Sequence, residues 1–245
     1  MKKIISIMIL LIGMHIFPAT LKKSPEKQQF VILAAYSYPF VDSDYWKAVI
    51  REGGEKIPYV VINPNNGPGN KVDLNYVRQL EENIKAGIKN IAYIRTNYQK
   101  RSLKSVLADV DKYYRLYGKN NLSGFFFDEV GVEEKNQPAY MKTIYEYVKN
   151  KSKDNLVNRF TEPESGFENN EDNFYRIWHI VYGAKPEQYE QIIKLSRKRN
   201  ARWLMITDDV QPNPYDDLPT NFRRMAAMIN NLDGTFSTIK CGNKN

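Results

Sequence analysis

The chain has 245 residues, of which 42% are hydrophobic and 13% aromatic, so it can bury a packed core and is not a disordered protein. Its net charge of +8 suits an anionic polymer or a cell envelope as partner. The densest basic run, residues 194–200, ends a helical pattern, where cations complement the helix dipole. We therefore predict no nucleic-acid partner.

The first residues have the layout of a secretory signal peptide. Lys2 and Lys3 precede a mostly apolar run from Ile4 to Phe17, which is short for a membrane-spanning helix. Phe17 stands where a small residue is preferred before cleavage, so an uncleaved anchor is the alternative. We expect a signal peptide over residues 1–19, a polar linker over 20–29, and a secreted, envelope or periplasmic protein. A membrane contact is expected only through an uncleaved leader.

After the linker, short apolar runs alternate with amphipathic segments. The pattern predicts strands at residues 30–39, 59–64, 90–96, 122–130, 155–160, 174–183, 202–207 and 234–239. It predicts helices at residues 45–53, 74–88, 103–117, 140–148, 185–199 and 221–232. Asp73 and Ser102 are the expected N-caps of the second and third helices.

Alternating strands and helices predict a parallel sheet. Eight such units in one domain, residues 30–240, fit an α/β fold of the (β/α)₈ TIM-barrel type, with a polar tail at 241–245. A doubly wound open sheet is the alternative. No G-x-G-x-x-G and no P-loop occurs, so no nucleotide cofactor is predicted. Cys241 is the only cysteine, which excludes an intrachain disulfide.

The active sites of parallel barrels lie where the strands end, so the residues after each predicted strand belong together. They share polar, aromatic or acidic side chains and are Tyr36, Tyr38, Asn63, Thr96, Tyr98, Asp128, Glu129, Asn158, Glu162, His179, Asp208 and Asp209. Carboxylates can perform acid–base catalysis, while amides and tyrosines bind sugar hydroxyls and ring faces. The set indicates a glycosidase, which usually needs two carboxylates.

Each candidate also has a simpler interpretation. Asp128 and Glu129 could be a solvated strand end, and His179 could be a satisfied core histidine. Zinc usually takes three or four ligands, and without a cysteine cluster no metal site is predicted. The acidic loop 166–173 lacks the spacing of a calcium-binding EF-hand, and no G-x-S-x-G nucleophile elbow occurs.

Several ordered motifs resemble a known family, the spherulin-4 (spherulation-specific family 4) proteins. The similar segments are "YSYP" with Trp46, "VINPNNGPG" (61–69), "AYIRTNYQKR" (92–101), "GFFFDE" (124–129) and "ITDDVQPNPYDDLP" (206–219). The similarity as a whole extends over roughly residues 31 to 239. Ala92 stands where the family usually has glycine.

The resemblance implies a (β/α)₈ barrel and glycoside hydrolysis, since characterised fungal members cleave galactosaminogalactan, which is rich in N-acetylgalactosamine. It implies that Asp128 and Glu129 occupy the catalytic positions. It also implies that five other residues line or support the cleft, namely Asn63, Tyr93, Thr96, Tyr98 and Arg101.

Two segments depart from the family pattern in ways that bear on catalysis. Arg159 and Phe160 replace the usual residues between Asn158 and Thr161, and His179 stands at or near the place of a third acidic residue at the end of the sixth strand. Adjacent strand residues point to opposite faces, so Asp128 and Glu129 need not face one glycosidic bond.

A second carboxylate would then come from Glu162, Glu164, Asp208 or Asp209, of which Glu162 is the preferred candidate because it follows the fifth strand. Alternatively, the N-acetyl group of the substrate could assist.

The sequence thus predicts an endo-acting glycoside hydrolase for an amino-sugar-containing polysaccharide. We expect Asp128 and Glu129 to be its catalytic pair and Glu162 its third acid, with no cofactor. The rival hypothesis is a catalytically impaired carbohydrate-binding or envelope-interaction barrel. A third, metal-dependent hydrolysis, would need several acidic neighbours for His179.

Overall fold

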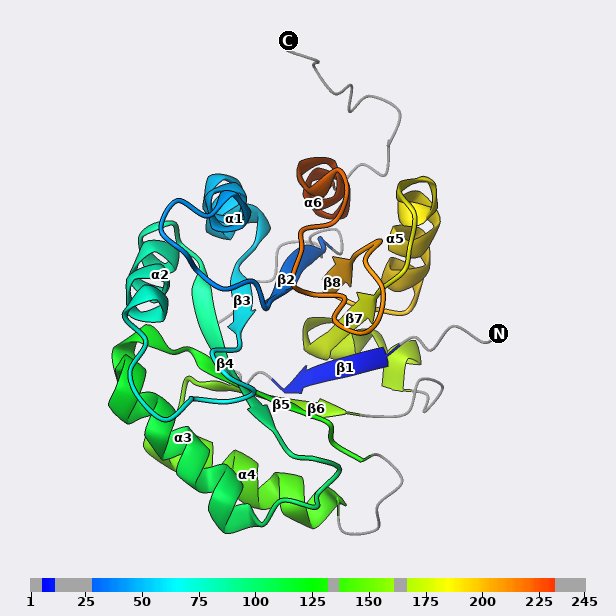
Figure 1. The fold of residues 1–245 in the computed structure, drawn as a ribbon. Helices are drawn as coiled ribbons and strands as arrows, with labels where there is room; N and C mark the ends of the chain where they lie inside the picture. The colour runs from blue at the N-terminus through cyan, green and yellow to red at the C-terminus, as the bar shows by residue number, and fades with distance from the viewer. Residues whose placement is uncertain (1–5, 12–27, 132–136, 161–166, 232–245) are drawn as a thin grey trace, which may run out of the picture.

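A computed structural model describes residues 6–11, 28–131, 137–160 and 167–231. Its centre is a curled sheet of seven parallel strands with helices outside it (Figure 1). The strands are β2 (Phe30–Ala35), β3 (Tyr59–Ile62), β4 (Lys89–Arg95), β5 (Gly124–Asp128), β6 (Leu156–Phe160), β7 (Ile177–Val181) and β8 (Trp203–Ile206). Each lies within a predicted strand or begins one residue before it, so the alternation of apolar and amphipathic runs located them well.

The helices occupy the predicted connections. They are α1 (Asp44–Lys56), α2 (Leu74–Lys85), α3 (Leu103–Tyr117), α4 (Gln137–Lys151), α5 (Tyr189–Lys198) and α6 (Phe222–Asn230). Both predicted N-caps are confirmed, because Asp73 accepts hydrogen bonds from the backbone of α2 and Ser102 accepts one from Ser105 N. No helix in the described part of the chain is long and apolar enough to cross a membrane.

The expectation of eight parallel strands is met only in part. β1 (Ser6–Leu11), from the predicted leader, lies between β6 and β7 and is antiparallel to both, closing the ring in the order β1-β6-β5-β4-β3-β2-β8-β7. The strand expected at 234–239 lies outside the described residues and stays a prediction.

The connection from β6 to β7 differs most from a regular barrel unit. Its described part holds the short 3₁₀ turns η2 (Phe167–Asn169) and η3 (Glu171–Arg176) where a regular unit has a covering α-helix. The strand predicted from 174 therefore starts only at Ile177. The remaining 3₁₀ turns are η1 (Lys119–Asn121) and η4 (Pro186–Gln188).

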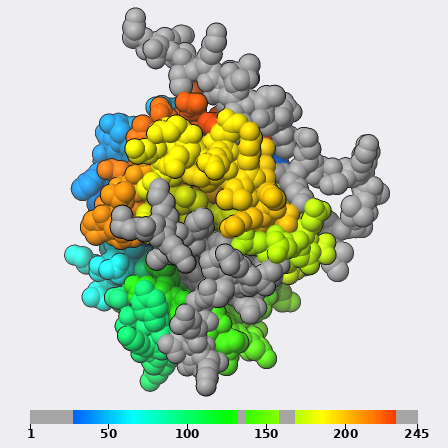
Figure 2. Space-filling view, turned by 90° about the vertical axis from the view of Figure 1, so that its right-hand side faces the viewer, coloured from blue at the N-terminus to red at the C-terminus, as the bar shows by residue number. Residues whose placement is uncertain are grey.

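The view in Figure 2, from the right-hand side of Figure 1, shows the yellow and orange segments of α5 and of the chain after β8 above the green segments of the middle of the chain. In the ring, β1 lies between β6, which belongs to the middle of the chain, and β7, which precedes α5.

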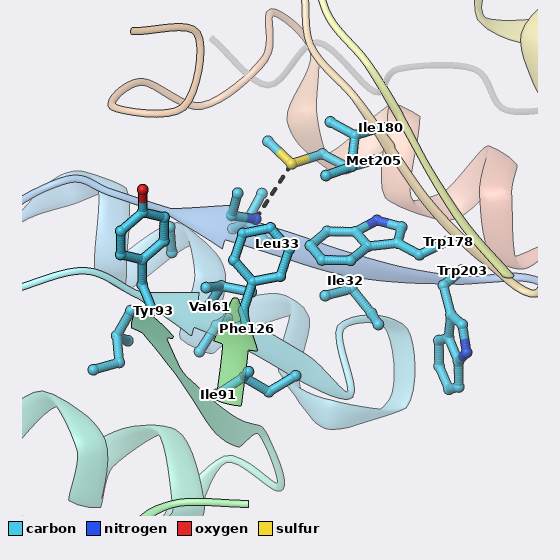
Figure 3. Close-up of a cluster of buried hydrophobic side chains, with 14 of the residues drawn as sticks. Ile32, Leu33, Val61, Ile91, Tyr93, Phe126, Trp178, Ile180, Trp203 and Met205 are labelled. Carbon is cyan, nitrogen blue, oxygen red and sulfur yellow. Dashed lines mark hydrogen bonds between the residues drawn. The ribbon is translucent and has the colours of Figure 1, made fainter. Parts of the chain in front are cut away.

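Successive side chains along each strand point alternately to the inside of the ring and to its outer face, where the helices pack. In register, Tyr93 pairs with Phe126, Trp178 with Trp203, and Ile180 with Met205. Figure 3 shows these side chains together with Ile91 and Val61 in one buried cluster. Apolar packing inside the ring thus supports the strand ends that carry the candidate site.

Candidate functional site

Asp128, the last residue of β5, lies two residues after Phe126 and so belongs to the same, inner face of the sheet. The hydroxyl of Tyr93 donates a hydrogen bond of 2.8 Å to its Oδ2. In Figure 3 the Tyr93 hydroxyl points away from Ile91, beyond the apolar cluster. The inner face therefore ends in a tyrosine–carboxyl pair.

The environment of Asp128 raises the pKa of its carboxyl above the ordinary value. Burial raises the pKa of this carboxyl, and the nearby charge of Glu129 raises it further. Hydrogen bonds from the Glu129 backbone and the Tyr93 hydroxyl oppose the rise but do not cancel it. A carboxyl with a raised pKa is suited to donate a proton near neutral pH.

Three tyrosines surround Asp128. The ring of Tyr36 lies edge-on to those of Tyr93 and Tyr215, with centroids 5.5 Å apart in both pairs. Burial, followed by the charge of Asp128, raises the pKa of Tyr215 to about 12, with Tyr182 contributing less. These phenols stay neutral and lie beside the carboxyl.

Glu129 is held apart from Asp128. Its φ of 53° is left-handed, which turns the chain directly after β5. Its Oε2 accepts a hydrogen bond of 2.7 Å from Nε of Arg95, in a partly exposed ion pair. The two adjacent carboxyls therefore differ, since Asp128 is half-buried with a raised pKa and Glu129 is paired with a cation.

The β4–α3 loop braces this turn. The fully buried Thr96 hydroxyl lies 2.9 Å from the carbonyl of Asp128 and 2.7 Å from that of Glu129. The side-chain amide of Gln99 donates to the carbonyl of Gly131 and accepts from its N–H. Two loops from neighbouring strands are thereby joined at the candidate site.

Residues 97–99 of this loop all have a left-handed backbone, with φ between 53° and 57°. Three consecutive non-glycine residues in this region are costly, at about 1–2 kcal/mol each, and the hydrogen bonds to the β5–α4 loop hold them there. Tyr98 is 53% exposed in this strained turn, so its ring is presented to solvent near Glu129.

Other sequence-predicted residues stabilise loops. The Tyr38 hydroxyl bonds Asp73 at the start of α2, and Oδ1 of Asn63 accepts the N–H of Gly67. Arg101 donates to the Arg95 carbonyl and pairs with Asp109 at 2.7 Å. None of these contacts is with Asp128 or Glu129.

The acids after β8 also stabilise their own loop. Oδ1 of Asp208 accepts the N–H of Thr220 at 2.8 Å, and Oδ1 of Asp209 accepts that of Val210. Burial raises the pKa of Asp208, but the Thr220 hydrogen bonds outweigh it and the net shift is downward. Glu162 lies outside the described residues.

Asn158 belongs to β6, where its backbone pairs with Leu10 of β1.

His179 is placed away from the inner face. It follows Trp178 in β7, so it belongs to the outer face, where its Nε2 lies 3.7 Å from Glu168 Oε2. Burial, and then the charge of Arg199, lower its pKa to about 4. By the same alternation Ile180, and Tyr182 just beyond the strand, fall on the inner side.

Reasoning from sequence missed Arg95, Gln99, Tyr182 and Tyr215. Arg95 and Tyr215 lie inside motifs already noted. Strand register places Arg95 opposite Asp128, and the loop after β8 places Tyr215 beside Tyr36. A strict inner–outer count along β7 would have selected Tyr182 instead of His179. Gln99 also lies inside the motif 92–101, but its contact could not be predicted because its partner is a backbone group.

Comparison with known proteins adds the family. The model of spherulation-specific family 4 matches residues 30–174. The chain belongs to this family. The matched region contains Asp128, Glu129, Tyr93 and Thr96, so these residues lie within the part of the chain that defines membership.

Solved structures show the fold relationship. The chain is similar to Sph3 of Aspergillus clavatus in complex with GalNAc, with a TM-score of 0.61 and 18% identity, over 83% of this chain and 98% of that one. Similarity to CpGH84D is lower, with a TM-score of 0.39 and 14% identity over 53% of this chain and 25% of that one. Comparison with curated protein sequences gave no match.

Proposed function

We propose that this spherulin-4 protein is an endo-acting glycoside hydrolase of the cell exterior or envelope, acting on an amino-sugar-containing polysaccharide. The observation that carries the proposal is the pair of unlike carboxyls after β5. Asp128 has a raised pKa beside Tyr93, and Glu129 is paired with Arg95. Unlike neighbouring acids suit a proton donor and a charged partner.

In the proposed reaction, Asp128 gives its proton to the glycosidic oxygen as the bond from the anomeric carbon to that oxygen breaks. The negative charge of Glu129 stabilises the positive charge that develops on the sugar ring. Water supplies a hydroxyl group to the anomeric carbon and a proton that restores Asp128. Glu162 is retained as the proposed second carboxylate, and assistance by a substrate N-acetyl oxygen as the alternative.

The substrate class rests on chemistry and family. Tyr36, Tyr93 and Tyr215 form a group of neutral phenols beside Asp128, of a kind that can bind sugar hydroxyls. Sph3, whose fold this chain shares, binds GalNAc, an N-acetylated amino sugar. We propose Tyr36, Tyr93 and Tyr98 as the sugar contacts, and Asn63, Thr96 and Arg101 as residues that shape the surrounding loops.

One observation favours a second candidate, a catalytically impaired carbohydrate-binding barrel. β7 carries no acid, and His179, its only ionisable residue, lies on the outer face beside Glu168 of η2. In this case Asp128 and its tyrosines would bind a glycan without cleaving it.

A single experiment separates the two candidates. The purified full chain is incubated with a panel of amino-sugar polymers, and the products are read by mass spectrometry. Wild-type protein should release oligosaccharides, and Asp128→Asn should reduce the rate by roughly 10²–10⁴-fold.

Asp42→Asn is the matched control, because Asp42 is exposed and its left-handed backbone suits asparagine. Glycan affinity without product from wild-type protein would establish the binding barrel. Unchanged turnover in Asp128→Asn would remove Asp128 from the mechanism.

A further inference from the structure

A hollow lies next to the candidate site. A pocket of about 300 Å³ opens between the loop 65–70 and α3, and Arg95, Arg101, Asp109 and Lys112 line it. We call these four side chains with the loop 65–70 the basic pocket. Three cations face one carboxylate there, so its charge is positive.

Two contacts show how the cations are held. The Arg101 guanidinium donates to Asp109 Oδ2 at 2.7 Å and to Ser105 Oγ at 2.8 Å. The negative charge of Asp109 is therefore already paired with Arg101. Lys112 is half-buried and donates to Oδ1 of Asn70 at 2.9 Å, and it makes no ion pair within the described residues. A lysine without a counter-charge in a pocket is suited to an anionic ligand.

The loop that forms the opposite wall is rich in amides and fixed in shape. Asn65, Asn66 and Asn70 are exposed at the pocket. The Asn65 N–H bonds the Gly67 carbonyl, and the Tyr117 hydroxyl bonds the Pro68 carbonyl. Amides that stand beside cations can bind the hydroxyls of a sugar while the cations bind its acidic group. A site for a bare inorganic anion does not need these amides.

Arg95 connects the basic pocket to the candidate catalytic pair. Its Nε donates to Glu129, one terminal nitrogen donates to Asn97, and its other terminal nitrogen has no hydrogen bond among the described residues. A ligand in the basic pocket would therefore contact the same guanidinium that holds Glu129. The pocket adjoins the site closely enough to take part of the same glycan.

We propose that the basic pocket is a subsite for an acidic sugar, whose carboxylate contacts Lys112 and Arg95. This inference rests on the proposed function, since it assumes that a glycan occupies the neighbouring site. The substrate would then contain acidic as well as amino sugars. The net charge of +8 agrees, because a basic protein repels a polycationic chain and attracts an anionic one.

Binding is the test, measured by calorimetry on the full chain carrying Asp128→Asn, so that no turnover interferes. The probes are an oligosaccharide of alternating N-acetylglucosamine and glucuronic acid, a neutral N-acetylglucosamine oligosaccharide of equal length, and inorganic phosphate. The acidic chain should bind roughly tenfold more tightly than the neutral one, and less so at high salt. Phosphate should bind more weakly than the acidic chain.

Lys112→Gln should reduce the affinity for the acidic chain by roughly three- to tenfold and leave the neutral chain unaffected. Lys104→Gln, an exposed position of the same helix outside the pocket, is the matched control for net charge and should change neither.

Equal affinity for both chains, equal losses in the two lysine variants, or phosphate binding as tight as that of the acidic chain would each overturn the inference. If the wild-type protein releases no product but prefers the acidic chain, the proposed hydrolysis fails and the acidic-sugar subsite stands.

Discussion

The hydroxyl of Tyr93 donates to Oδ2 of Asp128 across two neighbouring strands, at 2.8 Å. The bond is between two residues of the inner face, one at the end of β5 and the other two residues before the end of β4. It fixes the orientation of the carboxyl and favours its charged form, against the burial that favours the neutral one. The balance between these effects sets the pH at which Asp128 loses its proton.

Replacing Tyr93 by phenylalanine should move the pH profile upward. Without the hydroxyl the charged form of Asp128 loses a hydrogen bond, so its pKa rises further above the usual value. Activity that needs protonated Asp128 falls as the pH rises through this pKa. The basic limb of kcat/KM should therefore shift up by roughly 0.5–1 pH unit.

Tyr145→Phe, on α4, is the control for loss of a tyrosine hydroxyl away from the site. A basic limb that stayed in place or moved to lower pH in Tyr93→Phe would contradict the assignment of Asp128 as the acid.

Thr96→Val should lower both stability and turnover. Valine keeps the shape of threonine but removes the hydroxyl, whose single proton lies within reach of the carbonyls of both Asp128 and Glu129. Both carbonyls keep a backbone donor, Thr96 N–H for Asp128 and Tyr98 N–H for Glu129, so the loss of the hydroxyl should cost about 0.5–1.5 kcal/mol in the free energy of unfolding. Chemical denaturation of Thr96→Val measures the loss.

Thr143→Val removes an exposed helical hydroxyl and should cost far less. Equal effects of the two variants would show that the Thr96 hydroxyl has no special structural role.

Gly124→Ala should separate β5 from β6. A Cβ at Gly124 would lie 2.5 Å from the carbonyl oxygen of Leu156 and 2.6 Å from its nitrogen, so a backbone has to move. We expect a loss of about 1–3 kcal/mol in unfolding free energy together with reduced activity, because β5 carries Asp128. Ser123→Ala, one residue earlier, is the control, and a fully stable Gly124→Ala would refute the close packing.

His179 should make the protein sensitive to acid. Its pKa is about 4 in the folded state against 6.5 for the ordinary side chain, because burial disfavours the imidazolium and the positive charge of Arg199 disfavours it further. The unfolded chain therefore binds a proton first, and stability falls as the pH drops from 6.5 towards 4, by up to roughly 3 kcal/mol. Above pH 6.5 the group has no effect.

Unfolding measured at several pH values in wild type and His179→Gln checks this prediction. The glutamine variant should lose less stability over that interval. Parallel pH curves for the two proteins would show that His179 is not the group that titrates.

Much of the scaffold could be predicted from residue patterns, for reasons that particular elements make clear. The strand "GFFFD" and the cap Asp73 are local signals, and both appear where they were expected. The order of the ring could not be predicted, because the antiparallel pairing of β1 with β6 and β7 depends on long-range contacts that no local pattern encodes.

The site was predictable in its centre and less so at its margins. Asp128 and Tyr93 do lie together, as strand-end position and family resemblance suggested. Asn63 and Asp208 instead bond backbone groups of their own loops, which a list of polar residues cannot reveal. His179 shows the limit most clearly, since a shift of one residue along a strand changes the face.

β1 covers two sheet edges at once. Its backbone pairs with residues 157–160 of β6 on one side and residues 177–180 of β7 on the other. In a chain shortened to begin after the leader, those N–H and C=O groups would have lost their partner, and uncovered edges are templates for strands of other molecules. The state of the first residues would then govern how the protein behaves at high concentration: the full chain would stay dispersed, while a shortened chain would self-associate unless another of its own segments filled the slot.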